Sequence, residues 1–153
     1  MSLYNTFKTS KSLETEGVWL EYGKASDGVT PLRIRIARSG GDNKAYTKAM
    51  ERAAKPFRKS IQAGTFTNDQ ATELQKNCFV DHCILDWMGV EDETGKTLTF
   101  NRENVLKVMN DLPDLYADLV DQAASIALFR EEVLEADLGN SGRSSLTDSS
   151  KGQ

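Results

Sequence analysis

The fold class is decided by two stretches of sequence, Val18-Trp19-Leu20-Glu21-Tyr22 and Leu32-Arg33-Ile34-Arg35-Ile36-Ala37-Arg38. The first stretch places Val18, Leu20 and Tyr22 on one face, and the second alternates apolar with basic residues; both patterns are typical of half-buried β-strands. The sequence between them contains Gly23 and Gly28 and favours a tight turn, so residues 18–38 are predicted to form an antiparallel hairpin. Because a lone hairpin is only marginally stable in water, we expect this one to pack on helices.

Helical patterns account for most of the chain after the hairpin. Apolar residues recur every three or four positions in four segments, at about 43–63, 69–88, 101–110 and 114–137. Pro56 falls inside the first segment and removes a backbone donor there, so we expect a kink near Ala54-Lys55. The sequence therefore predicts an α+β protein, mostly α, with an N-terminal β-hairpin packed on four or five helices.

The two ends of the chain show no sustained apolar period. Residues 1–12 are polar and are predicted to form a mobile or loosely docked arm. Residues 138–153 are rich in serine and glycine, which predicts a disordered tail. Residues 13–137 are then a single domain, in keeping with a chain of 153 residues.

Composition and charge limit the classes of partner. The chain has 19 Lys and Arg residues against 23 Asp and Glu residues, a net charge of -4. This balance does not favour nucleic acid, which requires a clustered basic surface. No apolar run approaches the ~18 residues that suggest a membrane span, and the N-terminus does not begin as a signal peptide. We therefore expect a cytoplasmic protein that binds another protein or a small molecule.

Candidate metal or catalytic residues surround the single histidine, His82. Cys78 and His82 would share a helical face, whereas Cys83 would lie about 100° further round, and no second Cys/His pair completes a tetrahedral zinc site. No nucleophile motif occurs either. We predict a non-enzymatic protein with no metal or cofactor and with both cysteines reduced. A small regulatory enzyme or metal protein built on Cys78, His82 and Asp86 is an alternative.

Basic and aromatic residues supply the candidate partner-binding surface. Arg33, Arg35 and Arg38 form a basic row, either a solvated outer face or a docking site for an acidic protein or the chain's own acidic C-terminal helix. Large aromatic residues are frequent binding anchors, although they also fit the core or its rim. The candidate residues are Trp19, Arg33, Arg35, Phe57 and Trp87.

Four motifs, taken in order, resemble a known protein family. They are Arg33–Arg38 followed by Asn43–Tyr46, then Lys55–Lys59, then Leu85–Val90 followed by Glu91–Lys96, and last Phe100–Asn104 followed by Leu112–Leu115. In this order and spacing, over roughly residues 18–140, the chain is similar to the tail assembly chaperones of long, non-contractile-tailed bacteriophages and related prophages.

The resemblance implies an assembly factor of the host bacterial cytoplasm that is absent from the mature virion. Such a chaperone binds the tape measure protein and keeps it soluble while tail tube subunits polymerise. The resemblance also implies a -1 ribosomal frameshift, which makes a longer form that recruits tail tube protein. Leu138, Gly139 and Asn140 can be encoded by a suitable slippery sequence.

Two further expectations accompany the resemblance. The broad helical faces make a homo-oligomer plausible, although composition does not set the number of subunits. A structural minor tail or connector protein that is retained in the virion is the alternative from another functional class.

Overall fold

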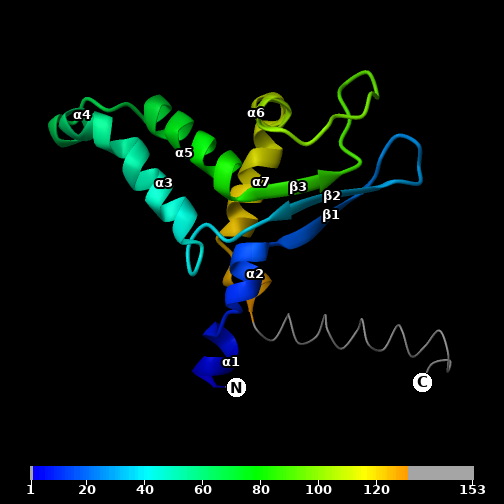
Figure 1. The fold of residues 1–153 in the computed structure, drawn as a ribbon, viewed down its shortest axis with the longest axis horizontal. Helices are drawn as coiled ribbons and strands as arrows, with labels where there is room; N and C mark the ends of the chain where they lie inside the picture. Colours follow the sequence, from blue (N-terminus) through cyan, green and yellow to red (C-terminus); the bar gives the residue numbers. More distant parts are fainter. Residues whose placement is uncertain (1, 131–153) are drawn as a thin grey trace.

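The computed structural model describes residues 2–130, and it confirms the predicted α+β class. In chain order the elements are α1 (Leu3–Phe7), α2 (Lys11–Glu16), β1 (Val18–Lys24), β2 (Pro31–Ile36), α3 (Lys44–Ala54), η1 (Lys55–Phe57), α4 (Arg58–Ala63), α5 (Asn68–His82), β3 (Ile84–Met88), α6 (Arg102–Asp111), α7 (Pro113–Ala123) and η2 (Ile126–Phe129). The strands form one antiparallel sheet in the order β1-β2-β3. Figure 1 shows α3 and α5 side by side as an arm that projects from the sheet.

The predicted hairpin is confirmed as β1 paired with β2, with Leu20 opposite Ile34. Its turn is closed by the carboxylate of Asp27, which accepts hydrogen bonds from the backbone N–H groups of Val29 and Thr30 at 2.8 Å each. An aspartate in this position mimics a backbone turn, so the local sequence is sufficient to specify the hairpin.

The helix predicted over residues 43–63 forms in three pieces, and the expected kink at Pro56 is confirmed. α3 gives way to the 3-10 turn η1, which contains the proline, and α4 follows. Gly64, with a φ of 75°, ends α4 in the left-handed conformation. α5 then begins with a capping box, in which Thr67 and Gln70 exchange hydrogen bonds, and runs beside α3.

The helix predicted over residues 69–88 is wrong in its last part, which forms β3 instead. Leu85 continues the helical period of α5, so the sequence pattern alone favours one long helix. As a strand, however, β3 pairs with the backbone groups on the second edge of β2, and Ile84 and Trp87 are buried. The sheet therefore contains a strand that the sequence did not predict.

α6 confirms the helix predicted over residues 101–110. The side chain of Asn101 caps this helix by accepting the backbone N–H of Asn104 at 2.8 Å. Pro113 then occupies the first turn of α7. A proline is tolerated there because backbone N–H groups in the first turn have no hydrogen-bond acceptor within the helix. The two helices are consequently separate, as predicted.

The helix predicted over residues 114–137 is too long, because α7 ends at Ala123. The carbonyl of Ala123 accepts the backbone N–H of Ser39 at 3.0 Å, and the chain then turns into η2, which buries Phe129 completely. Tertiary contacts therefore override the helical period at this point. The rest of that predicted helix and the predicted tail over residues 138–153 lie outside the described residues.

The N-terminal arm predicted over residues 1–12 contains α1 and the start of α2, neither of which the sequence predicted. Each helix begins at a serine, Ser2 or Ser10, whose side chain accepts a backbone N–H three residues further on at 3.2 Å. The backbone N–H of Ser10 also donates to the carbonyl of Phe129 at 2.8 Å. These caps are the only local signal for helices of five and six residues.

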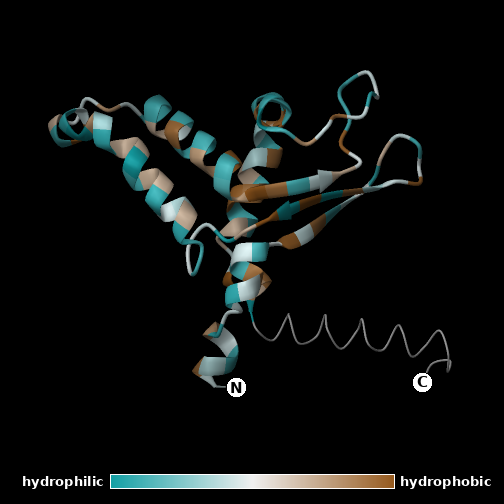
Figure 2. Cartoon of the chain, in the orientation of Figure 1, coloured by the Kyte–Doolittle hydropathy of each residue, from teal (hydrophilic) through white to brown (hydrophobic). Residues whose placement is uncertain are grey.

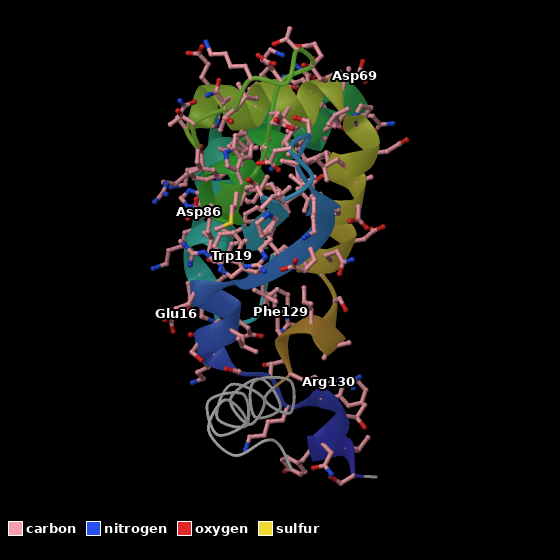
Figure 3. The ribbon with its side chains drawn as sticks, turned by 90° about the vertical axis from the view of Figure 1, so that its right-hand side faces the viewer. Glu16, Trp19, Asp69, Asp86, Phe129 and Arg130 are labelled. Atoms are coloured by element: carbon pink, nitrogen blue, oxygen red, sulfur yellow. The ribbon has the colours of Figure 1, made fainter. Side chains whose placement is uncertain are left out.

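The core lies on one face of the sheet. Its centre is Phe79 of α5, whose ring makes edge contacts with Tyr46 and Tyr116 at centroid distances of 6.3 and 5.7 Å. Figure 2 shows hydrophobic residues along the strands, and Figure 3 places Trp19 and Asp86 on the side of the sheet away from α7. One face of the sheet is therefore covered by helices while the other stays open. No helix in residues 2–130 has the length and apolar run needed to span a bilayer.

Candidate functional site

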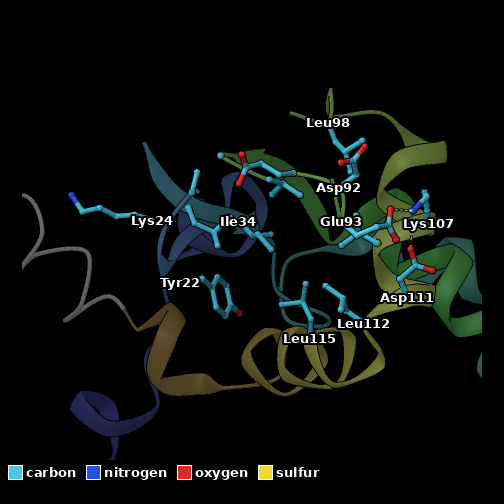
Figure 4. Close-up of a pocket in the computed structure, with 16 residues that line it drawn as sticks. Tyr22, Lys24, Ile34, Asp92, Glu93, Leu98, Lys107, Asp111, Leu112 and Leu115 are labelled. Atoms are coloured by element: carbon cyan, nitrogen blue, oxygen red, sulfur yellow. Dashed lines mark hydrogen bonds and ion pairs between the residues drawn. The ribbon is translucent and has the colours of Figure 1, made fainter. Parts of the chain in front are cut away.

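The candidate site is an apolar groove between the outer end of the sheet and the junction of α6 with α7 (Figure 4). Its volume is about 460 Å³, within the range of roughly 300–1,000 Å³ that is usual for ligand-binding sites. The apolar lining comprises Tyr22, Ala25, Leu32, Ile34, Gly89, Val90, Leu98, Val108, Leu112 and Leu115. The charged lining comprises Lys24, Glu91, Asp92, Glu93, Lys107 and Asp111. These residues define the acid-rimmed groove.

The floor of the groove is fixed by contacts between separate elements. The hydroxyl of Tyr22 donates to the carboxylate of Asp118 at 2.6 Å and joins β1 to α7. Burial, followed by this hydrogen bond, raises the pKa of Tyr22 well above its ordinary value, so the phenol stays protonated. Gly89, with a φ of 78°, turns the chain out of β3 where any side chain would meet the carbonyl of Pro31. The groove is thus part of the fold.

The rim carries four carboxylates and two ammonium groups, a formal charge of -2. The ammonium group of Lys107 lies 2.8 Å from a carboxylate oxygen of Asp111 and 3.5 Å from one of Glu93. The hydrogen bond to Asp111 is the main reason that the pKa of Lys107 is raised. Because the carboxylates outnumber the lysines, the rim carries a net negative charge.

The turn over residues 91–97 forms one wall of the rim. Glu91 accepts the backbone N–H and the hydroxyl of Ser26 at 2.9 and 2.7 Å, which ties this turn to the β1–β2 turn. Asp92 accepts the hydroxyl of Thr94 at 2.6 Å, and this bond is the main cause that holds the pKa of Asp92 below its ordinary value. Both acids are therefore held at the mouth of the groove, and Asp92 stays ionised.

Three of the predicted partner-binding residues, Trp19, Arg33 and Arg35, lie together on the open face of the sheet. The guanidinium carbon of Arg35 is 5.7 Å from the centre of the Trp19 ring, and the same side chain donates to the carbonyl of Glu16 at 2.7 Å. Arg33 pairs with Glu21 at 2.5 Å. Both arginines already have partners within the chain, so this face is not an unpaired basic surface.

The predicted basic row is wrong at Arg38, which turns inward. Its guanidinium pairs with the carboxylate of Glu14, a side chain only 2% exposed. Glu14 also accepts the backbone N–H of Asp42 at 3.0 Å. Gly41, with a φ of 54°, lies so close to both side chains of the pair that a Cβ atom there would collide with them. Arg38 therefore belongs to a buried structural contact.

The remaining predicted residues lie elsewhere. Phe57 is at the tip of the arm, where its ring packs against Phe66 at a centroid distance of 5.2 Å and stays 37% exposed. Trp87 is buried in β3, and its indole N–H donates to the carbonyl of Leu98 at 3.0 Å. The structure thus brings together Trp19, Arg33 and Arg35, but neither Phe57 nor Trp87 joins them.

Sequence reasoning missed the acid-rimmed groove. Tyr22, Leu98 and Leu115 come from three distant parts of the chain, and only Tyr22 and Leu115 lie in predicted elements, a strand and a helix. The sequence pattern shows that each strand or helix has an apolar face. It does not show whether a residue on that face is buried in the core or lines a groove. Only the tertiary arrangement separates the two.

The metal-ligand cluster of Cys78, His82 and Asp86 is not assembled. Within residues 2–130, no three side chains of His, Cys, Asp or Glu are placed to hold a metal ion. Cys78 and Cys83 are free and buried. Burial raises the pKa of the Cys83 thiol to about 12, so it stays protonated near neutral pH.

The structure describes a small α+β protein with an acid-rimmed groove at one end of its sheet. The chain belongs to the YdaY prophage protein family, whose family model matches residues 41–140, well over half of the sequence. The matched region includes the chain after β3, together with α6 and α7, and these segments supply most of the residues that line the groove. No curated protein and no solved structure matches the chain. The protein is therefore phage-derived, which confirms that part of the resemblance.

Proposed function

We propose that this protein is a tail assembly chaperone, a non-enzymatic factor that binds the tape measure protein in the acid-rimmed groove. The groove is the observation that carries the proposal. It offers apolar surface to solvent, with Leu112 as much as 52% exposed at its mouth. A long helical client needs its apolar stripe covered to stay soluble, and a groove of this kind covers such a stripe.

The proposal also covers where the protein acts and which forms of it are made. The protein acts in the host bacterial cytoplasm, while tail tube subunits polymerise, and is absent from the mature virion. A -1 frameshift at Leu138, Gly139 and Asn140 makes a longer form that recruits tail tube protein. These statements rest on the sequence resemblance and on the prophage family, since the three residues lie outside the described part of the chain.

Co-expression with the tape measure protein from the same prophage tests the proposal. We expect the wild-type chain to raise the soluble fraction of the tape measure protein and to co-purify with it. Leu112→Lys places a charge in the mouth of the groove and should abolish both effects. Leu3→Lys is the matched control, because Leu3 is 75% exposed on α1 and does not line the groove.

Two results would contradict the proposal. Equal solubility of the tape measure protein with and without the chain would remove the chaperone activity. Recovery of the chain in stoichiometric amount from purified particles would favour the structural tail or connector protein instead. The frameshift has its own test, intact-mass analysis of the gene expressed with its native downstream DNA, where a minor longer product must diverge near Gly139.

A further inference from the structure

The tip of the arm, residues 55–61, presents apolar side chains among basic ones. Phe57 and Ile61 are 37% and 47% exposed. Lys55, Arg58 and Lys59 are exposed beside them. No Asp or Glu occurs from residue 52 to residue 68, so the arm tip is uniformly basic around its apolar centre.

The acid-rimmed groove has the complementary character. Its floor is apolar and its rim has a formal charge of -2. α7, which follows the rim residue Asp111, also carries Asp114, Asp118 and Asp121, and no Lys or Arg occurs from residue 111 to residue 129. An apolar segment with basic flanks is therefore the partner that this groove fits, and an acidic partner would be repelled.

The arm tip cannot reach the groove of its own molecule. Figure 1 shows the arm tip and the outer loops of the sheet at opposite ends of the structure. α3 and α5 pack along each other, so the arm is a braced pair of helices and does not fold back over the sheet. A tip that enters a groove must come from another molecule.

We propose that the arm tip of one copy docks in the acid-rimmed groove of a second copy. This contact is heterologous, because the two surfaces that meet are different. Each copy offers one tip and one groove, so the contact propagates head to tail and either closes into a ring or continues as a filament. The proposal does not depend on the chaperone function.

Sedimentation velocity of the purified full-length chain over a range of concentrations tests the proposal. We expect concentration-dependent assemblies larger than a dimer, and we expect salt to weaken them because opposite charges meet at the contact. A tip variant, Lys55→Glu with Arg58→Glu and Lys59→Glu, should raise the dissociation constant by roughly a hundredfold, because like charges would then face each other. A groove variant, Leu112→Lys, should also prevent assembly.

Mixing the two variants separates a heterologous contact from any other. The tip variant keeps an intact groove and the groove variant keeps an intact tip, so together they should form a one-to-one heterodimer that grows no further. A control variant with the same change of charge, at Lys11, Lys44 and Lys48 to Glu, should assemble like the wild type. Circular dichroism shows whether each variant is folded, which is expected because the altered residues are exposed.

Three results would overturn the proposal. The first is a wild-type chain that stays monomeric at low salt at every concentration that it tolerates. The second is assembly that the tip variant leaves unchanged. The third is a mixture of folded tip and groove variants that stays monomeric although the wild type assembles. None of these measurements involves the tape measure protein, so they leave the chaperone function to its own test.

Discussion

Two arginine–glutamate pairs lie in different regions of the molecule and differ in their access to water. Arg33 and Glu21 meet on the open face of the sheet, where their side chains are 39% and 59% exposed. Arg38 and Glu14 meet where α2 contacts the chain after β2, and their side chains are 19% and 2% exposed. Water can replace a lost partner in the first pair but not in the second, so the same chemistry has unequal consequences for stability.

The carboxylate of Glu14 is held by more than its arginine. Burial by itself raises the pKa of Glu14, but hydrogen bonds from Arg38, from the backbone of Asp42 and from Thr9 outweigh it. The pKa of Glu14 therefore lies below its ordinary value of 4.5. The comparison teaches that a buried charge is tolerated where several donors converge on it.

The largest expected effect is that of Arg38→Ala. This change leaves the charge of Glu14 buried without its main partner, so we expect the free energy of unfolding to fall by about 3–5 kcal/mol. Arg33→Ala is the matched control and should cost at most about 1 kcal/mol. Urea unfolding followed by circular dichroism measures both. Equal losses from the two variants would contradict the distinction between the pairs.

The second effect concerns pH. Because the pKa of Glu14 is depressed in the folded chain, its contribution to stability is complete above the unfolded pKa and is lost as the pH falls through the folded pKa. Glu14→Gln should therefore be less stable than the wild type by about 1–3 kcal/mol at pH 7. The difference should shrink in acid. A difference that is constant across a pH series of urea unfolding curves would show that the charge of Glu14 is unimportant.

A smaller effect is expected at Gly41, which supports the buried pair. An alanine there must adopt the left-handed φ of 54° and also crowd Glu14 and Arg38, so Gly41→Ala should cost about 1–2 kcal/mol. Gly40→Ala provides the control, because a side chain at Gly40 meets nothing within 4 Å and its φ is not left-handed. Thermal unfolding of the two variants should rank Gly41→Ala clearly lower.

The smallest effect is the coupling between Arg33 and Glu21. A double-mutant cycle with Arg33→Ala and Glu21→Ala should give a coupling energy of about 0.2–1 kcal/mol, as is usual for exposed pairs. Added salt should reduce it further. A coupling as large as the loss in Arg38→Ala would mean that the open face of the sheet is shielded from solvent, for example by a bound partner.

The parts of the fold that the sequence predicts are those with local signals. The hairpin follows from the period-two pattern of its strands and from Asp27 in its turn, and α6 follows from a helical period with Asn101 as its cap. β3 has no such local signal, because Leu85 continues the helical period of α5. The residues form a strand because they pair with the free edge of β2, which is distant in sequence. The sequence pattern also fails to predict α1 and α2, because helices of five and six residues are too short to show a helical period.

The candidate site was less predictable than the fold. The groove is assembled from both strands of the hairpin, the chain after β3, and α6 with α7, so no single segment shows it. Arg38 illustrates the limit of a period-two pattern. β2 ends at Ile36, and the alternation that places Arg33 and Arg35 on one face no longer applies two residues later.

The position of β3 in the chain governs how the protein emerges from the ribosome. β1 and β2 are neighbours in sequence and can pair within about 1–10 μs, but the partner on the other edge of β2 is complete only at Met88. At about 5–20 residues per second, synthesis of the intervening chain takes several seconds. During that time the second edge of β2 has no strand partner on the nascent hairpin. A molecule that we propose keeps another protein soluble thus passes through a stage at which an edge of its own sheet is open to other chains.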